Sequence, residues 1–402
     1  MQCASSSIPA RIALITGDLN LGGVTTFLCN LGGELVRRKV PAAVFNFRKD
    51  NPMTSDFVRA DIPVLCLDDR RVVFEDRLKT VLLELGRFKP SIVMATHDAT
   101  SFEVLRYLPS GVFRVGVGQS DHSGVYEMMR HYAPHMDLLA VVSETMKTRA
   151  EAMPEFGRVP VRYLPYGVPI PPDDCLAARR FDRPLRILYL GRLSQAQKRV
   201  RSFPAILEWL KSSGIPFHWT VAGEGPEKEF LERTMKGSDT QTISFPGKIL
   251  YADVPRILSE HDVFLLASDH EGLPLSLLEA MGHGLVPVIS DLESGVREVV
   301  DAATGILVPV DDVAGYARAI IHLHEHRAEL AVKSAAARAR VKTKFSTRAM
   351  ADRWLAAFPK ESPAVDGWPS DWDIKPPLPA RHPVYFSPAM RALRRLAAKF
   401  RK

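Results

Sequence analysis

The sequence predicts an α/β fold with two Rossmann-like domains, each built on a doubly wound parallel sheet facing the other across a cleft. Short runs of β-branched and aliphatic residues alternate with helix-length periodic segments, which is typical of parallel strands joined by crossover helices. The alternation occurs twice, on either side of an aperiodic linker. A chain of 402 residues is long enough for two such domains.

The first set of predicted strands ends near residue 167. Its seven strands are RIALITG, AAVFNF, PVLCL, SIVMATH, FRVGVGQ, LLAVVS and VRYLPYG. The helical segment VTTFLCNLGGELVRR follows the first of them. We therefore expect the N-terminal domain to span residues 1–168.

The linker VPIPPDDCLAARRFDRP, residues 168–184, combines prolines and charges without periodicity and marks the boundary. The second set of predicted strands is RILYLGRL, HWTVAG, ISFPG, VFLLAS, VPVIS and GILVPV. We expect the C-terminal domain to span residues 169–345. Ligands of such sheets bind at the carboxyl ends of the strands, so the groove between the domains is the expected site.

Residues 346–402 follow the second domain and begin with the helical segment STRAMADRWLAAF, which we expect to cross back onto the first domain. Residues 359–388 contain eight prolines and predict an extended strap or, alternatively, a loose linker. Residues 389–402 hold six basic residues and no acid, with apolar residues at helical spacing. This basic amphipathic helix is expected either to bind an anionic membrane surface or to pack on its own protein.

Composition narrows the class of protein. The chain is 46% hydrophobic and 25% charged, as in ordinary globular domains, and no apolar run is long enough to span a membrane. The N-terminus lacks the basic head and apolar core of a secretory signal. The four cysteines form no C-x-x-C pair. We expect a cytoplasmic protein that could also associate peripherally with the inner face of the membrane. We expect no nucleic-acid partner, because the sequence shows no basic groove interleaved with aromatics.

Two acids in SDHEGLPLSLLEAMGHGLVPVIS are the strongest functional signal. Glu271 lies in a loop after a predicted strand, and Glu279 lies in an apolar helix expected to begin near Pro274 and to end at Gly284. A helix start at Gly272, Leu273 and Pro274 offers free backbone N–H groups to a phosphate. The carboxylates of Glu271, before this helix start, and Glu279, beyond it, could accept hydrogen bonds from the hydroxyls of a hexose and a ribose. The alternative is a capping acid and a salt-bridged helix residue.

Other candidates follow neighbouring strands of the second domain. Arg192 and Lys198, in GRLSQAQKR, could neutralise a diphosphate or could be solvated charges. Gly223 in VAGEGPE permits close backbone approach to a ligand or only a turn. Lys248, after ISFPG, could meet a nucleobase through its backbone.

The first domain offers weaker candidates. Gly22 and Gly23 separate a strand from a helix, which suits either phosphate approach or a plain tight turn. His97 and His122 each follow a strand end and could bond a sugar hydroxyl or transfer a proton. A lone loop histidine is, however, more often structural.

The ordered fragments LYLGRLSQAQKR, VAGEGPE, ISFPG, VFLLASDHEGLPLSLLEAMGHGLVPVISDLESGVREVV and TGILVPV resemble the donor half of the retaining glycosyltransferases of family 4 (glycosyl transferases group 1), which have the GT-B fold. The resemblance covers residues 186 to about 345 strongly and residues 11–167 more loosely. It implies a UDP- or GDP-sugar donor and a hydroxyl acceptor in a glycan or glycolipid, as in surface polysaccharide synthesis. The first domain would then bind the acceptor and the second the donor.

The resemblance also implies roles for individual residues. Glu271 would contact the donor sugar, Glu279 the ribose, and Arg192 and Lys198 the diphosphate. The turn Gly272, Leu273 and Pro274 would supply amides. Gly23 would lie near the phosphates and His122 beside the sugar.

Two departures from the family pattern stand out. The loop from Arg192 to Lys198 is one residue longer than the commonest form, which puts the reach of Lys198 in doubt. Val24 and Thr25 replace a pair that is often more polar, which leaves acceptor contacts open. No Asp-x-Asp run follows a predicted strand, so we expect metal-independent transfer with no cofactor beyond the nucleotide sugar.

In the expected reaction, the acceptor hydroxyl attacks the anomeric carbon from the same face that the nucleotide leaves. The departing phosphate oxygen helps to take the proton of that hydroxyl. Two alternatives stay open: a sugar-nucleotide epimerase of the same fold, and a catalytically silent sugar-nucleotide-binding protein.

Overall fold

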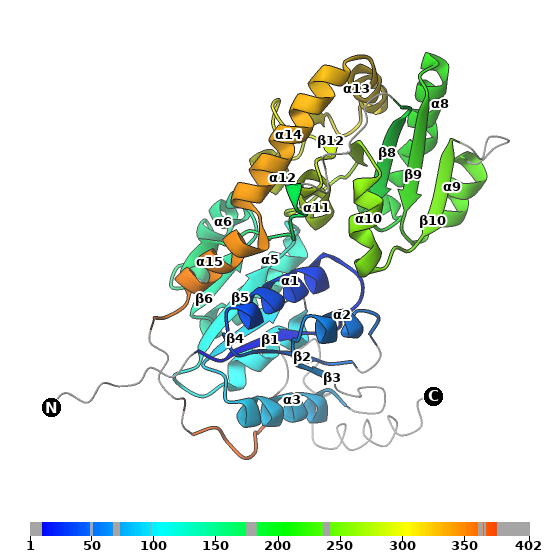
Figure 1. The fold of residues 1–402 in the computed structure, drawn as a ribbon. Coiled ribbons are helices and arrows are strands. Elements are labelled where there is room, and N and C mark those ends of the chain that lie inside the picture. The colour runs from blue at the N-terminus through cyan, green and yellow to red at the C-terminus, as the bar shows by residue number, and fades with distance from the viewer. Residues whose placement is uncertain are drawn as a thin grey trace. The chain divides into compact units, whose positions relative to one another are not determined.

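Two parallel sheets form the frame of the protein (Figure 1). The computed structural model describes residues 10–48, 51–66, 73–96, 98–173, 183–235, 242–360, 365 and 367–375. The predicted fold class is confirmed: all thirteen expected strands are present, and every strand pair is parallel.

The first sheet has seven strands in the order β3-β2-β1-β4-β5-β6-β7. Its strands are β1 (Ile12–Thr16), β2 (Ala42–Asn46), β3 (Val64–Cys66), β4 (Ile92–Thr96), β5 (Phe113–Gly118), β6 (Leu138–Val141) and β7 (Val161–Tyr163). The order reverses between β1 and β4, which pair directly. This reversal is the topological switch point of a doubly wound sheet.

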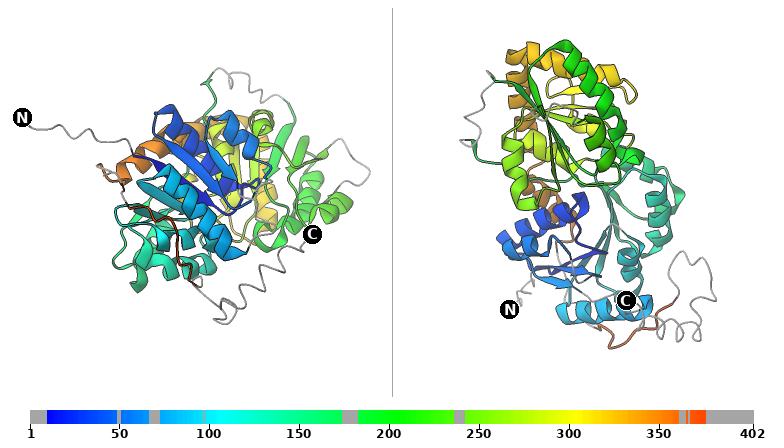
Figure 2. Two further views of the ribbon diagram at one scale, coloured as in Figure 1. Left: turned by 90° about the horizontal axis from the view of Figure 1, so that it is seen from below. Right: turned by 90° about the vertical axis from the view of Figure 1, so that its right-hand side faces the viewer.

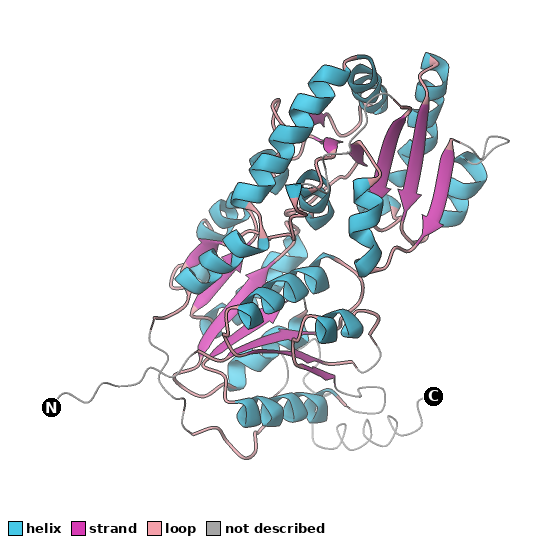
Figure 3. Ribbon diagram, viewed as in Figure 1, coloured by secondary structure: helices cyan, strands magenta, loops and turns pink. Residues whose placement is uncertain are grey.

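Helices cover both faces of the first sheet, because right-handed crossovers on the two sides of the switch point place helices on opposite faces (Figure 3). They are α1 (Gly23–Arg37), α2 (Thr54–Arg59), α3 (Phe74–Phe88), α4 (Ala99–Glu103), α5 (Ser123–Tyr132) and α6 (Glu144–Glu151). Strands β1, β2 and β4 are buried along their whole length, which explains their continuous apolar sequences.

The second sheet has six strands in the order β10-β9-β8-β11-β12-β13. Its strands are β8 (Leu185–Leu190), β9 (Phe217–Ala222), β10 (Ile243–Gly247), β11 (Val263–Leu266), β12 (Val286–Ser290) and β13 (Ile306–Val308). Strands β8 and β11 pair at its switch point, with Ile187 opposite Val263. The loops after β8 and β11 therefore leave the same edge side by side.

The helices of the second domain pack in two layers. They are α7 (Gln195–Lys198), α8 (Phe203–Ser213), α9 (Lys228–Met235), α10 (Val254–Ser259), α11 (Leu275–Gly282), α12 (Gly295–Val299), α13 (Val313–Glu325) and α14 (Arg327–Lys344). Helix α13 packs beside α8, and α14 packs beside α11 (Figure 2). The last helix among the described residues, α15 (Thr347–Ala357), follows α14.

The chain divides into two compact units whose boundaries fall after residues 164 and 350. One unit holds residues 1–142, 146–164 and 351–402, and the other holds residues 143–145 and 165–350. A parallel bridge between Val168 and Ser346 joins the two ends of the second unit. The end of α15 belongs with the first unit, where the ring centroids of Trp354 and Phe27 lie 5.8 Å apart.

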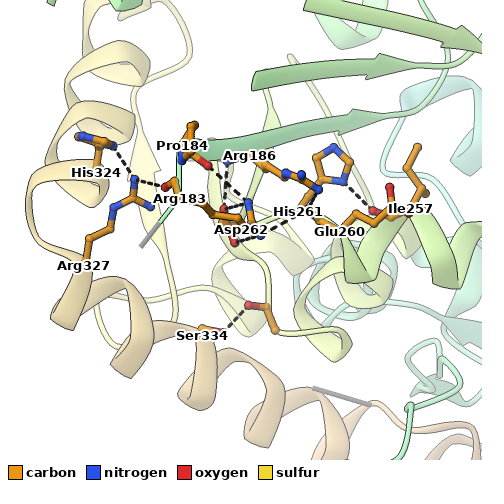
Figure 4. Close-up of polar contacts among 11 residues, drawn as sticks. Arg183, Pro184, Arg186, Ile257, Glu260, His261, Asp262, His324, Arg327 and Ser334 are labelled. Carbon is orange, nitrogen blue, oxygen red and sulfur yellow. Dashed lines mark hydrogen bonds and ion pairs between the residues drawn. The ribbon is translucent and has the colours of Figure 1, made fainter. Parts of the chain in front are cut away.

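A buried polar cluster closes the amino end of strands β8 and β11 (Figure 4). Asp262 is 1% exposed and accepts hydrogen bonds from both terminal nitrogens of Arg183, at 3.0 and 3.1 Å, and from the backbone N–H of Arg186. Arg327 donates to the carbonyl of Arg183 from α14. This cluster lies at the end of the sheet where the parallel strands start, opposite the edge where ligands of doubly wound sheets bind.

Part of the proline-rich strap lies on the first domain. The indole N–H of Trp372 donates to the carbonyl oxygen of Tyr107 at 3.1 Å, and Lys79 pairs with Asp371 at 2.8 Å. Ile374 is buried. Residues 371–374 of this segment thus contact the first domain, while the basic segment 389–402 lies outside the described residues. Within the described part of the chain, no helix combines the length and apolar character required to cross a membrane.

Candidate active site

The carboxyl edge of β8 and β11 brings together the two strongest predicted site residues. Lys198 is the last residue of α7, in the loop after β8, and Glu271 lies in the loop after β11. The Nζ atom of Lys198 lies 2.5 Å from Oε1 of Glu271. The side chains are only 14% and 7% exposed. An ion pair held this far from solvent keeps much of its electrostatic strength.

Neighbouring contacts hold the two loops together. The carbonyl oxygen of Gln197 accepts from the backbone N–H of Asp269, and its side-chain amide donates to the carbonyl of His270. Arg199 adds an ion pair to Asp269 at 2.8 Å. These contacts fix the position of α7 against the Glu271 loop, so the extra loop residue does not keep Lys198 from Glu271.

Tyr189 is buried in β8 and holds the loop that carries Arg192. Its hydroxyl donates to the carbonyl oxygen of Arg192 at 2.6 Å. Burial, and then the nearby charge of Glu271, raise the pKa of Tyr189 because both disfavour the phenolate. Arg192 itself is exposed, and its guanidinium forms no ion pair with a described residue. It is therefore a cation held at its backbone and available to an anion.

At Gly223 and Gly225, close contact with neighbouring backbone leaves no space for a side chain. A Cβ atom on Gly223 would lie 1.8 Å from the carbonyl oxygen of Gly191, and one on Gly225 would lie 2.3 Å from that of Leu193. Their φ angles are 145° and 158°. These glycines let the turn after β9 pack under the Arg192 loop, which is a structural reason for them independent of any ligand.

Helix α11 begins one residue later than expected. Pro274 is its N-cap, with ψ of 118°, and the helix runs from Leu275 to Gly282, so it also ends before Gly284. The chain leaves the helix there because Gly284 adopts a left-handed φ of 76°. No side chain caps the first turn, and that turn contains no acid. Its amides therefore remain an anion-binding end of a helix dipole.

The turn before α11 is buried and tightly packed. Gly272, Leu273 and Pro274 are all buried. The backbone N–H of Gly295 donates to the carbonyl oxygen of Gly272 at 2.9 Å, and a Cβ on Gly295 would lie 2.6 Å from that oxygen. Helix α12 thus fixes the orientation of the turn.

Glu279 lies on α11, about one turn beyond its first residue. It is partly exposed, and its carboxylate makes no hydrogen bond or ion pair with a described residue. Burial raises the pKa of Glu279 to about 8, because the charged form loses hydration without gaining a partner. A hydroxyl pair from a ligand would supply the missing donors.

Lys248 is exposed and follows β10 directly. The preceding residue, Gly247, has a left-handed φ of 75°. A Cβ there would lie 3.0 Å from Oε1 of Glu224. The structure places Lys248 at the same strand edge as the other candidates of this domain, two strands away from β8.

In the first domain, Gly23 is exposed and is the first residue of α1, directly after the N-cap Gly22. His122 is exposed and is the N-cap of α5, where its Nδ1 accepts from the backbone N–H of Gly124 at 3.1 Å. This bond leaves the proton of the neutral imidazole on Nε2, which can donate to a ligand. His97 lies outside the described residues.

A search of the described residues finds no cluster of three or more His, Cys, Asp or Glu side chains suited to a metal ion.

The comparison with known proteins identifies the second domain. Residues 184–326 match the family model described as Glycosyl transferases group 1. These residues form a glycosyl transferases group 1 domain. The matched segment contains Lys198, Glu271 and Glu279, so the group 1 domain carries the whole strand edge described above.

Relatives and solved structures agree with this. The amylovoran biosynthesis glycosyltransferase AmsK of Erwinia amylovora is 33% identical over 172 residues, which are 41% of this chain and 42% of AmsK. The chain spans about half or less of the length of the first curated relatives it matches.

The crystal structure of an S. aureus TarM mutant, in complex with fondaparinux, α-GlcNAc-glycerol and UDP, has a TM-score of 0.72 at 13% identity, covering 86% of this chain and 99% of TarM. HepE of Anabaena in complex with UDP-glucose has a TM-score of 0.70 at 16% identity, covering 87% and 100%. At these identities the likeness shows the fold, and the expected GT-B fold class is confirmed. Membership of family 4 stays a prediction.

Sequence reasoning missed some of the residues that build the group 1 domain's site. It assigned Lys198 to a diphosphate without anticipating its bond to Glu271. It did not anticipate that Tyr189 holds the Arg192 loop, because a tyrosine inside an apolar strand carries no sign of its partner. Sequence reasoning also assigned no role to Arg199, which pairs with Asp269, because the adjacent Lys198 was the candidate cation.

Proposed function

We propose that this protein is a retaining glycosyltransferase that moves a hexosyl unit from a UDP- or GDP-sugar to a hydroxyl of a glycan or glycolipid. One observation supports this most: the Lys198–Glu271 pair lies in the loops of two adjacent strands, and the uncapped amides of α11 follow within the same loop. A cation, a carboxylate and an anion-binding helix end suit a ligand that joins a diphosphate to a polyol.

The donor binds along this edge of the group 1 domain. Its diphosphate lies against the amides of Gly272, Leu273 and the first turn of α11, with Arg192 and Lys198 neutralising its charge. Its hexose hydroxyls donate to Glu271, and its ribose hydroxyls donate to Glu279.

Flanking residues complete the donor contacts. The backbone around Lys248 meets the edge of the base. Gly223 acts by supporting the Arg192 loop, because only glycine lets the backbone pack this closely against the carbonyl oxygen of Gly191. In the first domain, Gly23 at the start of α1 approaches the phosphates, since an exposed helix start without an acid attracts anions. His122 donates from Nε2 to a hexose hydroxyl.

The transfer retains the configuration of the anomeric carbon. The acceptor oxygen forms its bond to that carbon on the face where the bond to the diphosphate oxygen breaks. The electron pair of the broken bond leaves with the diphosphate, and the acceptor's proton passes to a phosphate oxygen. Lys198, Arg192 and the helix amides stabilise the charge that grows on this leaving group. No metal ion takes part in the proposed step.

The acceptor belongs to surface polysaccharide or glycolipid synthesis on the cytoplasmic side of a membrane. The similarity to AmsK, an amylovoran biosynthesis glycosyltransferase, supports this assignment. We also propose that the basic segment 389–402 binds an anionic membrane surface, because cations alternate with apolar residues at helical spacing in its sequence. Trp372 and Asp371 tie the chain that precedes it to the first domain.

The membrane proposal is tested by sedimentation of the full chain with phosphatidylglycerol or phosphatidylcholine vesicles. Binding to the anionic vesicles alone, lost when Arg391, Arg394 and Arg395 are changed to Glu, supports it. Equal sedimentation of that variant with anionic vesicles would refute it.

The catalytic proposal is tested by incubating the protein with UDP-glucose, UDP-N-acetylglucosamine and GDP-mannose, with EDTA present throughout. Release of nucleoside diphosphate with one donor, and transfer to an octyl hexoside with retained anomeric configuration by proton NMR, supports it. An epimerised nucleotide sugar would show an epimerase instead. Binding of a donor without any turnover would show a silent binding protein.

A further inference from the structure

Gln119 is a polar residue of the first domain that neither the predicted site nor the proposed mechanism uses. It is the first residue beyond β5, which lies between β4 and β6 in the interior of the sheet. It therefore stands at the carboxyl edge of the first sheet, three residues before His122. Ligands of doubly wound sheets bind at that edge.

The side-chain amide of Gln119 is buried without a hydrogen-bond partner. Both Nε2 and Oε1 are inaccessible to solvent, and neither bonds to a described residue. An amide can donate two hydrogen bonds and accept two. A buried amide left unsatisfied costs about 1–3 kcal/mol in protein mutational data. Native proteins tolerate such groups where function needs them.

The surrounding loop is held firmly, so the unsatisfied amide is not the result of a loose segment. Asp121 accepts from the hydroxyl of Tyr126 at 2.8 Å and pairs with Arg149 at 2.5 Å. His122 is fixed by its bond to the N–H of Gly124. The side chains of Asp121 and His122, two and three residues beyond Gln119, thus have protein partners, in contrast to the amide itself.

Gln119 is only half-buried as a whole, so part of the residue already meets solvent at this edge. A change of side-chain rotamer is the movement that would bring its amide to a ligand. Its amide matches a sugar hydroxyl, which donates one hydrogen bond and accepts another.

We infer that Gln119 is a specificity residue whose amide binds a sugar hydroxyl, and this inference rests on the proposed glycosyltransferase function. The shared chemistry is a polyol, and the hydroxyl belongs either to the donor hexose or to the acceptor sugar. Its amide nitrogen would donate one hydrogen bond to that hydroxyl, and its amide oxygen would accept one from it. Substrates lacking the hydroxyl would leave the amide unsatisfied and would be rejected.

The test compares Gln119→Leu, which keeps the size but removes both polar atoms, with Ser120→Ala as a matched control in the same loop. Each full-length variant is measured for its thermal unfolding temperature and for KM. One arm measures KM for UDP-glucose, UDP-N-acetylglucosamine or GDP-mannose in nucleotide release without acceptor. The other arm measures KM for octyl hexosides in transfer.

The inference predicts that Gln119→Leu unfolds at the same temperature as wild type or higher, because two unsatisfied atoms are removed. It also predicts a KM raised about tenfold or more in one arm, and that arm identifies the sugar. A lower unfolding temperature with both KM values unchanged would overturn it and indicate an amide bonded to internal water. No turnover of any donor by wild type would refute the proposed function, and this inference would fall with it.

Discussion

Lys198 and Glu271, 73 residues apart in the chain, form an ion pair of 2.5 Å that joins the loops after β8 and β11. The pair bridges the switch point of the second sheet, where a doubly wound fold binds its ligand. Each side chain satisfies the other until a ligand arrives. In the proposed mechanism a donor takes over both, since its phosphate would replace Glu271 beside Lys198 and its hydroxyls would replace Lys198 beside Glu271.

Changing Lys198 to Ala should lower kcat by about 10²- to 10³-fold, because the leaving diphosphate loses a cation close to its growing charge. Glu271→Gln should raise KM for the donor and lower kcat together. Steady-state nucleotide release measures both. The matched control is Lys228→Ala, which removes an exposed Lys–Glu pair of 2.7 Å from the same domain. Equal activity of Lys198→Ala and Lys228→Ala would contradict the assignment.

The raised pKa of Glu279 predicts a pH-dependent stability. The folded protein holds this proton up to about pH 8, whereas the unfolded chain releases it near its ordinary value of 4.5. The contribution of Glu279 to the free energy of unfolding is therefore largest below pH 4.5 and falls as the pH rises to 8. Glu279→Gln should remove this fall. Its unfolding temperature relative to wild type should be higher at pH 8.5 than at pH 5, and a constant difference would count against the shift.

Donor affinity should depend on the same group. A ribose diol donates to the ionised carboxylate of Glu279, so donor binding by wild type should strengthen as the pH rises from 6 to 9 and should release protons near pH 7. Glu279→Gln should bind more weakly and with little pH dependence. Calorimetry in buffers of different ionisation enthalpy measures both quantities. Parallel pH profiles for the two proteins would exclude this contact.

Gly223 should tolerate no side chain. The Cβ of Gly223→Ala would overlap the carbonyl oxygen of Gly191 at 1.8 Å, and backbone atoms cannot move aside cheaply. We expect a loss of about 3 kcal/mol or more in the free energy of unfolding. Gly214→Ala is the control: its φ of 74° is also left-handed, but no atom lies within 4 Å of the added Cβ. Its cost should stay near 1 kcal/mol, and similar costs for both variants would refute the packing argument.

The Asp262 cluster should matter for stability alone. Asp262→Ala leaves the guanidinium of Arg183 and the N–H of Arg186 without their partner in a buried setting, which should cost about 3–5 kcal/mol. KM for the donor should stay unchanged below the unfolding transition. Asp173→Ala, which removes a largely exposed partner of Arg338 and Lys342, should leave the free energy of unfolding almost unchanged. A changed donor KM in Asp262→Ala would show that the cluster reaches the site.

The strands of both domains could be predicted from the sequence because each is a short apolar run bounded by turn residues. The strand ends also predicted where Lys198, Arg192 and Glu271 would gather. Pairing within that group could not be predicted, since it depends on the direction of side chains in loops far apart in sequence. Gly223 gave the same sequence signal as a phosphate-binding turn, although its reason is the carbonyl of Gly191. Gln119 gave no signal, because an unsatisfied amide becomes visible only once its surroundings are known.

Amide hydrogen exchange can show whether a diphosphate lies on the backbone N–H groups at the start of α11, on which the proposed donor site depends. Exchange is followed by mass spectrometry in peptides covering residues 268–282, with and without the donor that the activity panel selects. We expect slower exchange at residues 272–277 in wild type, and no such protection in Lys198→Ala at the same donor concentration. Saturating donor that leaves these amides unprotected while slowing exchange elsewhere would contradict this expectation.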